Sequence, residues 1–189
     1  MYQPHPAFAR DAAGKPRYQD LGRDDVAATW KISDFKETGT RELTAGDYIY
    51  QIKRLAHPRL HSPILHFMFE HIVGLKEFAD ALKATDKARA DSGERDAWID
   101  MTQVPLAGVE LVDRYTYRIK LEGNYPQFVY WLAMPFFAPL PVEVDRFFAQ
   151  PGMAERNLTL DWWPVGTGPY MMTENNPNAR MVLERNPNF

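Results

Sequence analysis

Residues 163–170, Trp-Pro-Val-Gly-Thr-Gly-Pro-Tyr, and residues 182–189, Val-Leu-Glu-Arg-Asn-Pro-Asn-Phe, form the most informative part of this chain. The centre of the first stretch is Gly166, Thr167, Gly168 and Pro169. Glycine tolerates close backbone approach and unusual conformations, while proline keeps its predecessor out of the helical region. The pattern therefore predicts a tight turn that leads into an extended run at residues 170–173. No Lys-Ser/Thr pair follows the second glycine, so the turn is not a phosphate loop. A structural turn is the favoured interpretation, and a turn that cradles a ligand is the alternative.

The composition is that of a folded protein without a bias toward nucleic acid. The 189 residues are 45% hydrophobic and 13% aromatic, and they can hold one domain, or one domain and part of another. A net charge of −3 argues against a general nucleic-acid binder, which concentrates basic residues on one face. Cysteine is absent, which excludes disulfides, thiolate catalysis and cysteine-ligated zinc.

The sequence contains no evident membrane span or export signal. Its most apolar stretch, residues 130–142, is interrupted by three prolines, and a spanning helix cannot run through them. The first residues lack a basic region followed by an apolar core. If the protein is exported, we expect the signal peptide to lie outside this sequence.

The first half of the chain predicts a short strand and two helices. Residues 30–35 alternate in the manner of a strand. Thr44 is a predicted N-cap with Asp47 as the acid of a capping box, and Arg54 lies near the helix C-terminus, where a cation is favourable. A second helix is predicted from residue 62 to residue 82, with Gly74 as a soft spot or a point of close contact.

The second half changes to the period of a strand. Apolar and polar residues alternate from residue 109 to residue 122, with Asp113-Arg114 in the middle, which predicts a hairpin with one buried face. Short amphipathic helices are predicted at residues 127–132 and 142–149. A strand, then helices, then strands without a regular repeat indicates an α+β fold.

Four histidines, His57, His61, His66 and His71, are the main candidates for catalytic or metal chemistry. Metal sites on helices favour two histidines four residues apart. His57 and His61 have this spacing, but a proline lies between them, and His66 and His71 are five apart. No Gly-x-Ser-x-Gly motif offers a serine nucleophile. A hydrolase or metalloenzyme that uses the His57–His71 region is thus an alternative that the sequence disfavours.

Aromatic residues give a stronger indication of binding. Six of them lie between residues 125 and 137, where they suit either a core or a wall of a ligand cleft, because rigid rings give contact area at low entropic cost. Phe67, Phe69 and Glu70 lie on the part of the second predicted helix that is least committed to its apolar face. We predict that these three residues reach a ligand or another lobe.

Three blocks of the sequence resemble solute-binding protein family 5, the extracytoplasmic proteins that serve peptide, oligopeptide and nickel ABC transporters. Residues 43–55 resemble the pattern V-T-A-x-D-V-V-Y-S-x-x-R-L, and residues 108–119 resemble G-V-x-x-x-D-x-x-T-V-x-I. The opening stretch resembles P-x-G-T-G-P-Y followed by L-x-R-N-P-x-Y/F. Residues 1–40 match poorly. The matching residues include Thr44, Asp47, Arg54, Asp113, Gly166, Thr167, Gly168, Pro169, Asn186 and Pro187.

The resemblance implies a periplasmic-binding-protein-like fold of class II type, with two lobes that close around a ligand by hinge motion. It implies that residues 1–138 form the smaller α+β lobe and that residues 139–189 begin the return into the principal ligand-binding lobe, with the C-terminal lobe absent. We therefore expect a fragment of a larger protein. Most ligand contacts should lie outside it.

The function implied by the resemblance is that of a non-enzymatic substrate-binding component of an ABC transporter. Such a protein captures peptides or similar solutes outside the cytoplasmic membrane and delivers them to permease subunits. The expected location is periplasmic or otherwise extracytoplasmic, with no cofactor, metal or nucleic acid. The ligand stays open among peptide, nickel, heme and sugar. A non-catalytic interaction module, whose aromatic residues dock a partner chain, is the other alternative.

Overall fold

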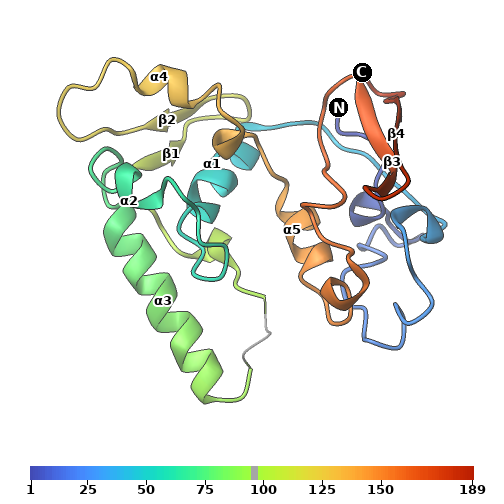
Figure 1. The fold of residues 1–189 in the computed structure, drawn as a ribbon. Helices are drawn as coiled ribbons and strands as arrows, with labels where there is room; N and C mark the ends of the chain where they lie inside the picture. The colour runs from blue at the N-terminus through green and yellow to red at the C-terminus, as the bar shows by residue number, and fades with distance from the viewer. Residues whose placement is uncertain (95–97) are drawn as a thin grey trace. The chain divides into compact units, whose positions relative to one another are not determined.

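The chain folds into two compact units in a computed structural model that describes residues 1–94 and 98–189 (Figure 1). Unit 1 comprises residues 1–43 and 141–189, and unit 2 comprises residues 44–140. The sequence predicted residues 1–138 as one lobe, whereas the first 43 residues pack with the C-terminal segment. Backbone hydrogen bonds between distant segments explain the difference, because Gln3 N donates to Gly166 O at 2.9 Å. The assignment of either unit to a lobe stays a prediction.

Unit 2 is built around the helix α1, which contacts the elements β1, β2, η3 and η4; η denotes a 3₁₀ helix. The elements of unit 2 are α1 (Ala45–Arg54), α2 (Leu65–Met68), α3 (Leu75–Asp91), η3 (Met101–Gln103), β1 (Val109–Leu111), β2 (Tyr117–Ile119), α4 (Phe128–Trp131) and η4 (Pro135–Phe137).

The start of α1 confirms the predicted capping box. Thr44 has an extended backbone, its side chain accepts from the third residue of the helix, and the Asp47 carboxylate accepts the Thr44 amide at 2.9 Å. This exchange satisfies two amides that a helix start otherwise leaves unpaired. Arg54 lies in the last turn, as predicted. Because the box uses only residues 44–47, its sequence pattern was sufficient to find it.

The second predicted helix is wrong as one element, because the chain breaks it into α2 and α3. The segment between them pairs with the residues that follow β2: Val73 N donates to Lys120 O at 3.1 Å, and Glu122 N donates to His71 O at 2.8 Å. Gly74 then turns the chain with φ 72°, and a Cβ there would lie 3.1 Å from that of Ala107. The apolar period continued through the break, so only the pairing could reveal it. Gly74 is the predicted point of close contact.

The predicted hairpin is confirmed as the antiparallel pair β1–β2, with Val109 opposite Ile119 and Leu111 opposite Tyr117. Asp113 begins its turn, since its Oδ1 accepts the amide of Tyr115 at 2.8 Å. That hydrogen bond is the main reason that the pKa of the Asp113 carboxyl lies below its usual value. Only part of the expected buried face exists, because Leu111 is 57% exposed.

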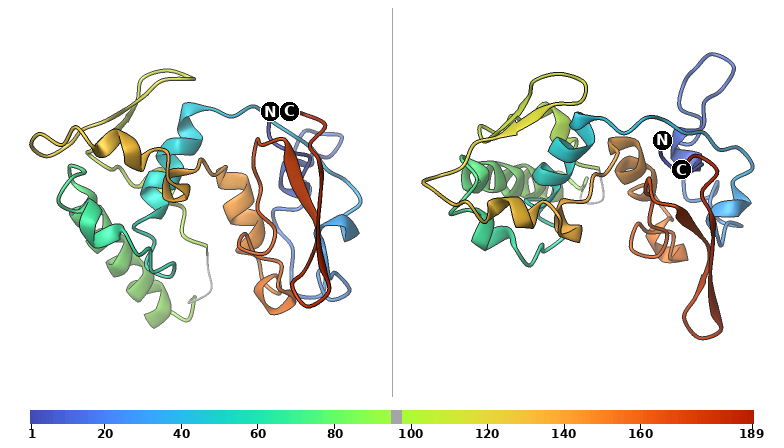
Figure 2. Two further views of the ribbon diagram at one scale, coloured as in Figure 1. Left: turned by 45° about the horizontal axis from the view of Figure 1, so that its top comes forward. Right: turned by 90° about the horizontal axis from the view of Figure 1, so that it is seen from above.

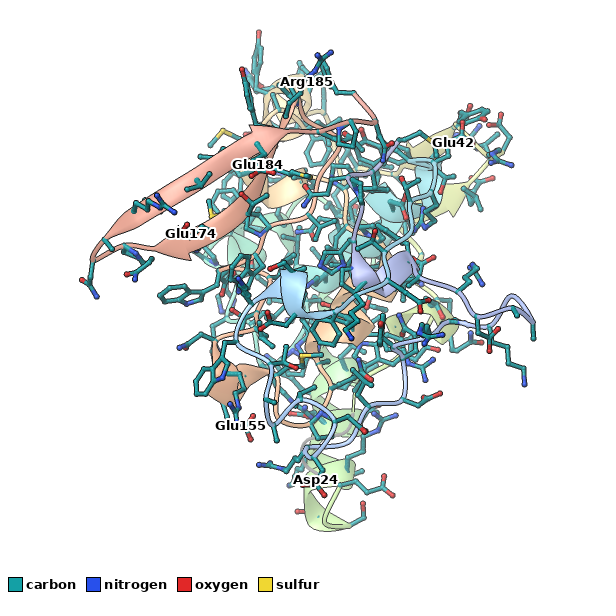
Figure 3. All side chains as sticks on the ribbon, turned by 90° about the vertical axis from the view of Figure 1, so that its right-hand side faces the viewer. Asp24, Glu42, Glu155, Glu174, Glu184 and Arg185 are labelled. Atoms are coloured by element: carbon teal, nitrogen blue, oxygen red, sulfur yellow. The ribbon has the colours of Figure 1, made fainter. Side chains whose placement is uncertain are left out.

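Unit 1 joins the two ends of the chain, which lie side by side in Figure 1 and in both views of Figure 2. The antiparallel strands β3 and β4 form its hairpin, whose turn projects from the rest of the unit (Figure 3). The elements of unit 1 are η1 (Pro6–Phe8), η2 (Ile32–Asp34), α5 (Val142–Phe148), η5 (Ala154–Arg156), β3 (Tyr170–Asn176) and β4 (Arg180–Arg185).

The strand predicted at residues 30–35 is wrong, because the 3₁₀ helix η2 replaces it. The Asp34 carboxylate accepts the amides of Trp30 at 2.9 Å and Lys31 at 3.1 Å. These local bonds curl the backbone, and side chain-to-backbone bonding of this kind competes with strand formation. The short helices predicted near residues 127–132 and 142–149 are confirmed as α4 and α5. Helices and small antiparallel sheets in separate segments make the fold α+β, as predicted.

Candidate functional site

The signature turn at residues 166–169 holds the N-terminal segment of unit 1. Gly166 N donates to the Gln3 side-chain oxygen at 3.1 Å, and the Gln3 side-chain amide donates to Pro164 O at 3.4 Å. β3 begins at Tyr170, which confirms the predicted turn into an extended run. Neither Gly166 nor Gly168 has a positive φ, and a Cβ on either would meet no atom closer than 3.9 Å. The hydrogen bond from the Gly166 amide to Gln3 gives this turn a structural role.

Asn186 closes the base of the β3–β4 hairpin. Asn186 is 1% exposed. Its Nδ2 donates to Gly168 O at 2.9 Å, and its Oδ1 accepts the Asn188 amide at 3.0 Å. Its own amide donates to Pro169 O at 2.8 Å. The Asn188 side chain in turn donates to Tyr2 O at 2.8 Å. The second half of the signature thus fixes the hairpin and the N-terminus together, while Pro187 is exposed and Thr167 half-buried.

An ion pair links the two segments of unit 1. Arg41 makes a two-pronged contact with the Glu143 carboxylate at 2.9 and 2.8 Å. The guanidinium also lies over the rings of Tyr2 and Phe8, 5.5 and 5.7 Å from their centroids. Planar stacking and a two-pronged carboxylate contact are features that arginine provides and lysine does not. This contact positions the N-terminal segment beside α5.

A cavity of roughly 180 Å³ lies in unit 1 against this N-terminal segment. Its walls come from segments far apart in sequence, namely the first residues, η2, the residues before the signature turn, and β3. Trp163 is 7% exposed, and Met171 and Met172 are half-buried. The residues lining the cavity are Gln3, Pro4, His5, Ile32, Ser33, Thr38, Trp163, Pro164, Met171, Met172 and Thr173.

His5 is a neutral member of this lining. Burial lowers the pKa of its imidazole from 6.5 to about 3, because a protonated ring loses its hydration when it is buried. The rings of Phe8, Phe147 and Phe148 surround it, with centroids 5.2–6.3 Å away. Its Nδ1 accepts the amide of Ala7 at 3.1 Å, so Nε2 carries the proton. The imidazole is therefore uncharged at physiological pH.

The residues predicted to reach a ligand lie in unit 2. Phe67 is 41% exposed and its ring lies 5.2 Å from that of Trp131 and 4.6 Å from that of His71. Phe69 is half-buried and packs against His66, and Glu70 is exposed. The rings of His71 and Tyr125 are stacked at 4.2 Å, and Trp131 Nε1 donates to the Tyr125 hydroxyl at 3.0 Å. Phe67 thus belongs to an aromatic cluster, and a ligand contact by these three residues stays a prediction.

An open groove of roughly 500 Å³ adjoins this cluster. Residues of β2 and α4 line it, and Tyr125 belongs to both features. The residues lining the groove are Tyr117, Ile119, Leu121, Tyr125, Pro126, Phe128, Val129 and Leu132. The dense aromatic stretch of the sequence is therefore divided, with Phe128 and Phe137 in the core and Tyr130 exposed.

The histidines of the His57–His71 region do not converge. His57 Nδ1 accepts the amide of Arg59 at 3.2 Å, and His71 stacks on Tyr125. Within residues 1–94 and 98–189, no three histidine, aspartate or glutamate side chains are grouped so as to hold a metal ion. The described part of the chain therefore offers no geometric support for the metalloenzyme alternative.

Lys53 is a buried cation of α1 with a structural role. Its Nζ donates to the carbonyl oxygens of Met101 at 3.0 Å, Thr102 at 3.4 Å and Val104 at 2.7 Å. Burial lowers the pKa of its ammonium group, and Asp100 opposes that shift. Carbonyl oxygens that face a buried cation satisfy part of its lost hydration. Lys53 thus fixes the segment around η3 to α1.

The signature lies within a region that matches a known protein family. The family model described as "Bacterial extracellular solute-binding proteins, family 5 Middle" matches residues 37–189. The chain belongs to this family. Family membership confirms the resemblance carried by the three sequence blocks, and it agrees with the mixed helix-and-sheet fold. The match leaves out residues 1–36, which lie within the poorly matched residues 1–40.

Curated relatives are much longer than this chain. The periplasmic oligopeptide-binding protein OppA of Salmonella typhimurium is 27% identical over 178 residues, which are 87% of this chain and 28% of the relative. OppA of Escherichia coli is 26% identical, over 82% of this chain and 24% of its own length. The periplasmic murein peptide-binding protein MppA of Escherichia coli is 27% identical, over 87% and 28%.

One solved structure also resembles part of the chain. It is the substrate-binding domain of an oligopeptide ABC transporter from Bacillus anthracis str. Ames, with a TM-score of 0.48 and 20% identity. The similarity covers 78% of this chain and 24% of that one. Separately, no helix among the described residues combines the length and the apolar character needed to cross a membrane.

Sequence reasoning missed the unit 1 cavity. Its walls include Gln3, His5 and Thr38 from the poorly matched region, and no local pattern connects these residues to Met172. Trp163 was noticed as part of the signature, but the residues of the N-terminal segment that line the cavity with it were not. The only local signal was His5 itself, a histidine between two prolines and outside the histidine cluster.

Proposed function

We propose that this protein is the substrate-binding component of an ABC transporter and that it captures peptides or similar solutes outside the cytoplasmic membrane. The family match over residues 37–189 carries the proposal. The printed names of the relatives, which are oligopeptide- and murein peptide-binding proteins, support peptides as the solute class. Within this chain the signature residues hold the turn, the hairpin and the N-terminal segment together. This structural role is compatible with a receptor whose ligand contacts lie elsewhere.

Peptide recognition in a receptor of this kind needs backbone contacts and tolerant side-chain pockets. An extended peptide offers an amide and a carbonyl at every residue, and these give affinity independent of sequence. Ordered water fills pockets that a given side chain does not. The partners that follow from this proposal are a peptide solute and the permease subunits of the transporter, in the periplasm or another extracytoplasmic space.

Calorimetry with a mixed pool of di- to pentapeptides tests the proposed function. The complete gene product is titrated beside the 189-residue chain, with the same amino acids in free form as the control. We expect saturable heat from the complete gene product with peptides and none with free amino acids. No heat from peptides, together with saturable binding of nickel, heme or a sugar, would identify another solute class and refute peptide capture.

The proposed receptor releases its solute unchanged. Peptides recovered after overnight incubation should therefore have their original masses by mass spectrometry, and a nearby gene pair for a permease and an ATPase should accompany the gene. Peptide cleavage that copurifies with the protein through two chromatographic steps would contradict the non-enzymatic role.

A further inference from the structure

The unit 1 cavity has the size of one amino-acid side chain. Its volume is roughly 180 Å³, whereas an engineered apolar cavity of about 150 Å³ holds one benzene molecule. The space is therefore sufficient for one leucine or phenylalanine side chain, and too small for a folded partner segment. It is partly open to solvent, so a group on a bound molecule can enter it.

The lining selects an uncharged, apolar group. Of the described residues that form it, none carries a charge at neutral pH, since His5 is held neutral by burial. Trp163, Met171 and Met172 are large apolar residues of the lining. Methionine adapts its shape to different apolar partners and recurs on binding surfaces that accept varied ligands. A charged group would lose its hydration here without gaining a partner.

Polar groups border this apolar space. Ser33 and Thr38 are exposed, and their hydroxyls have no hydrogen-bond partner within residues 1–94 and 98–189. The Gln3 amide, in contrast, is already engaged by Gly166 and Pro164. A ligand pocket typically combines an apolar interior with a few polar groups that orient the ligand. Hydroxyls beside a pocket for one side chain suit the amides and carbonyls of a peptide backbone.

We propose that the cavity between Trp163, η2 and β3 is a subsite for one uncharged, apolar side chain of a peptide solute. The inference rests on the proposed function for the source of that side chain, and on the cavity itself for its chemistry. It assigns the poorly matched N-terminal region a role, since Gln3, His5, Ser33 and Thr38 come from it. Peptides with a leucine or phenylalanine at the matching position should bind better than peptides with glycine or aspartate there.

Methionine methyl groups give a direct readout. The complete gene product and the 189-residue chain are labelled with [methyl-¹³C]methionine and titrated with N-acetylphenylalaninamide, and the matched probes are N-acetylglycinamide and N-acetylaspartamide. We expect saturable shifts of the Met171 and Met172 methyl signals with the phenylalanine probe alone, at concentrations on the order of 1–10 mM. Met153, buried in unit 1 away from the cavity, and the exposed Met181 should not shift.

Two variants fill the cavity from different segments of its lining. Met172→Trp acts from β3, with Met181→Trp as its control on β4. Ser33→Phe acts from the exposed rim, with Lys36→Phe as its control, so a folding defect in one variant leaves the other. We expect each filling variant to weaken probe binding at least tenfold and each control to leave it unchanged. Shifts that do not saturate, or that survive both filling variants, would overturn the subsite.

The remaining outcomes separate this inference from the proposed function. In one outcome the complete gene product binds peptides by calorimetry while its Met172 methyl signal does not shift with the phenylalanine probe. That result refutes the subsite and leaves peptide capture standing. If the probe binds but no peptide does, peptide capture fails, and with it the peptide source of the side chain. If both bind, Ser33→Phe should reduce the preference for phenylalanine over glycine peptides at least fivefold.

Discussion

His5 should make unit 1 less stable as the pH falls, because the folded protein holds this imidazole neutral. Burial lowers its pKa from 6.5 to about 3. The aromatic rings around it offer no anion, and Arg41, which lies over the Phe8 ring, is paired with Glu143. In the unfolded chain the imidazole takes up a proton near pH 6.5. Protonation therefore favours the unfolded chain throughout the window between pH 6.5 and pH 3.

The magnitude follows from the two pKa values of His5. In this window the unfolded chain binds more protons than the folded one, so the free energy of unfolding decreases as the pH is lowered. The His5 contribution that is lost between pH 7 and pH 5 is about 2 kcal/mol, because each pKa unit corresponds to about 1.4 kcal/mol. The loss reaches its limit, about 5 kcal/mol, below pH 3, where both forms are protonated.

Urea unfolding at pH 5, 6 and 7 tests this contribution. Replacing Trp98 and Trp131 by phenylalanine leaves tryptophans only in unit 1, so that fluorescence reports that unit. His5→Asn preserves an acceptor for the Ala7 amide but does not titrate, and its pH dependence should be smaller than that of the parent by about 2 kcal/mol. His66→Asn, an exposed histidine on α2, is the control. Parallel pH dependences for the parent and His5→Asn would refute the reasoning.

Three further substitutions, and Gly168→Ala as a control for one of them, test the scaffold by urea unfolding. Lys53→Met leaves three carbonyl oxygens without their donor and should lower the free energy of unfolding by about 2–3 kcal/mol; a change below 0.5 kcal/mol, on the order of an ordinary surface substitution, would mean that the loop pairs elsewhere. Asn186→Ala removes two side-chain hydrogen bonds at the base of the hairpin and should cost about 1–3 kcal/mol, with weaker amide-exchange protection in β3 and β4 as the specific sign. Gly108→Ala places a Cβ 2.3 Å from Val73 O and should be strongly destabilising. Gly168→Ala, whose Cβ meets no atom within 4 Å, should leave the free energy of unfolding unchanged. Equal effects of the two substitutions would show that the backbone at Gly108 moves to accommodate the Cβ.

Features that depend on neighbouring residues were predicted well. The capping box needs only Thr44 and Asp47, and the hairpin turn needs Asp113 and the residues that follow it. Local hydrogen bonds form these features, so composition and spacing are enough to find them. Residues 30–35 show the limit of the same approach, because the Asp34 carboxylate bonded the local backbone and changed the predicted strand into η2.

The break between α2 and α3 and the unit 1 cavity could not be predicted in this way. The apolar period runs unbroken past Gly74, and backbone pairing of His71 and Val73 with the residues after β2 interrupts the helix. The predicted site residues Phe67, Phe69 and Glu70 were chosen because they lie away from the apolar face of a predicted helix, and the structure places Phe67 in a cluster with Trp131. Nothing near residue 67 in the sequence indicates that partner.

The amino-acid sequence by itself determined the family, the α+β class, and the elements at Thr44, Asp113 and the signature turn. The local elements depend on residues within about one turn of one another, and the family depends on motifs that can be recognised in the sequence alone. The tertiary structure alone decided that His5 is buried and neutral, and that residues 1–43 pack with residues 141–189. These features require contacts such as that between Gln3 and Gly166, 163 positions apart, and the free energy of such contacts depends on the whole folded unit.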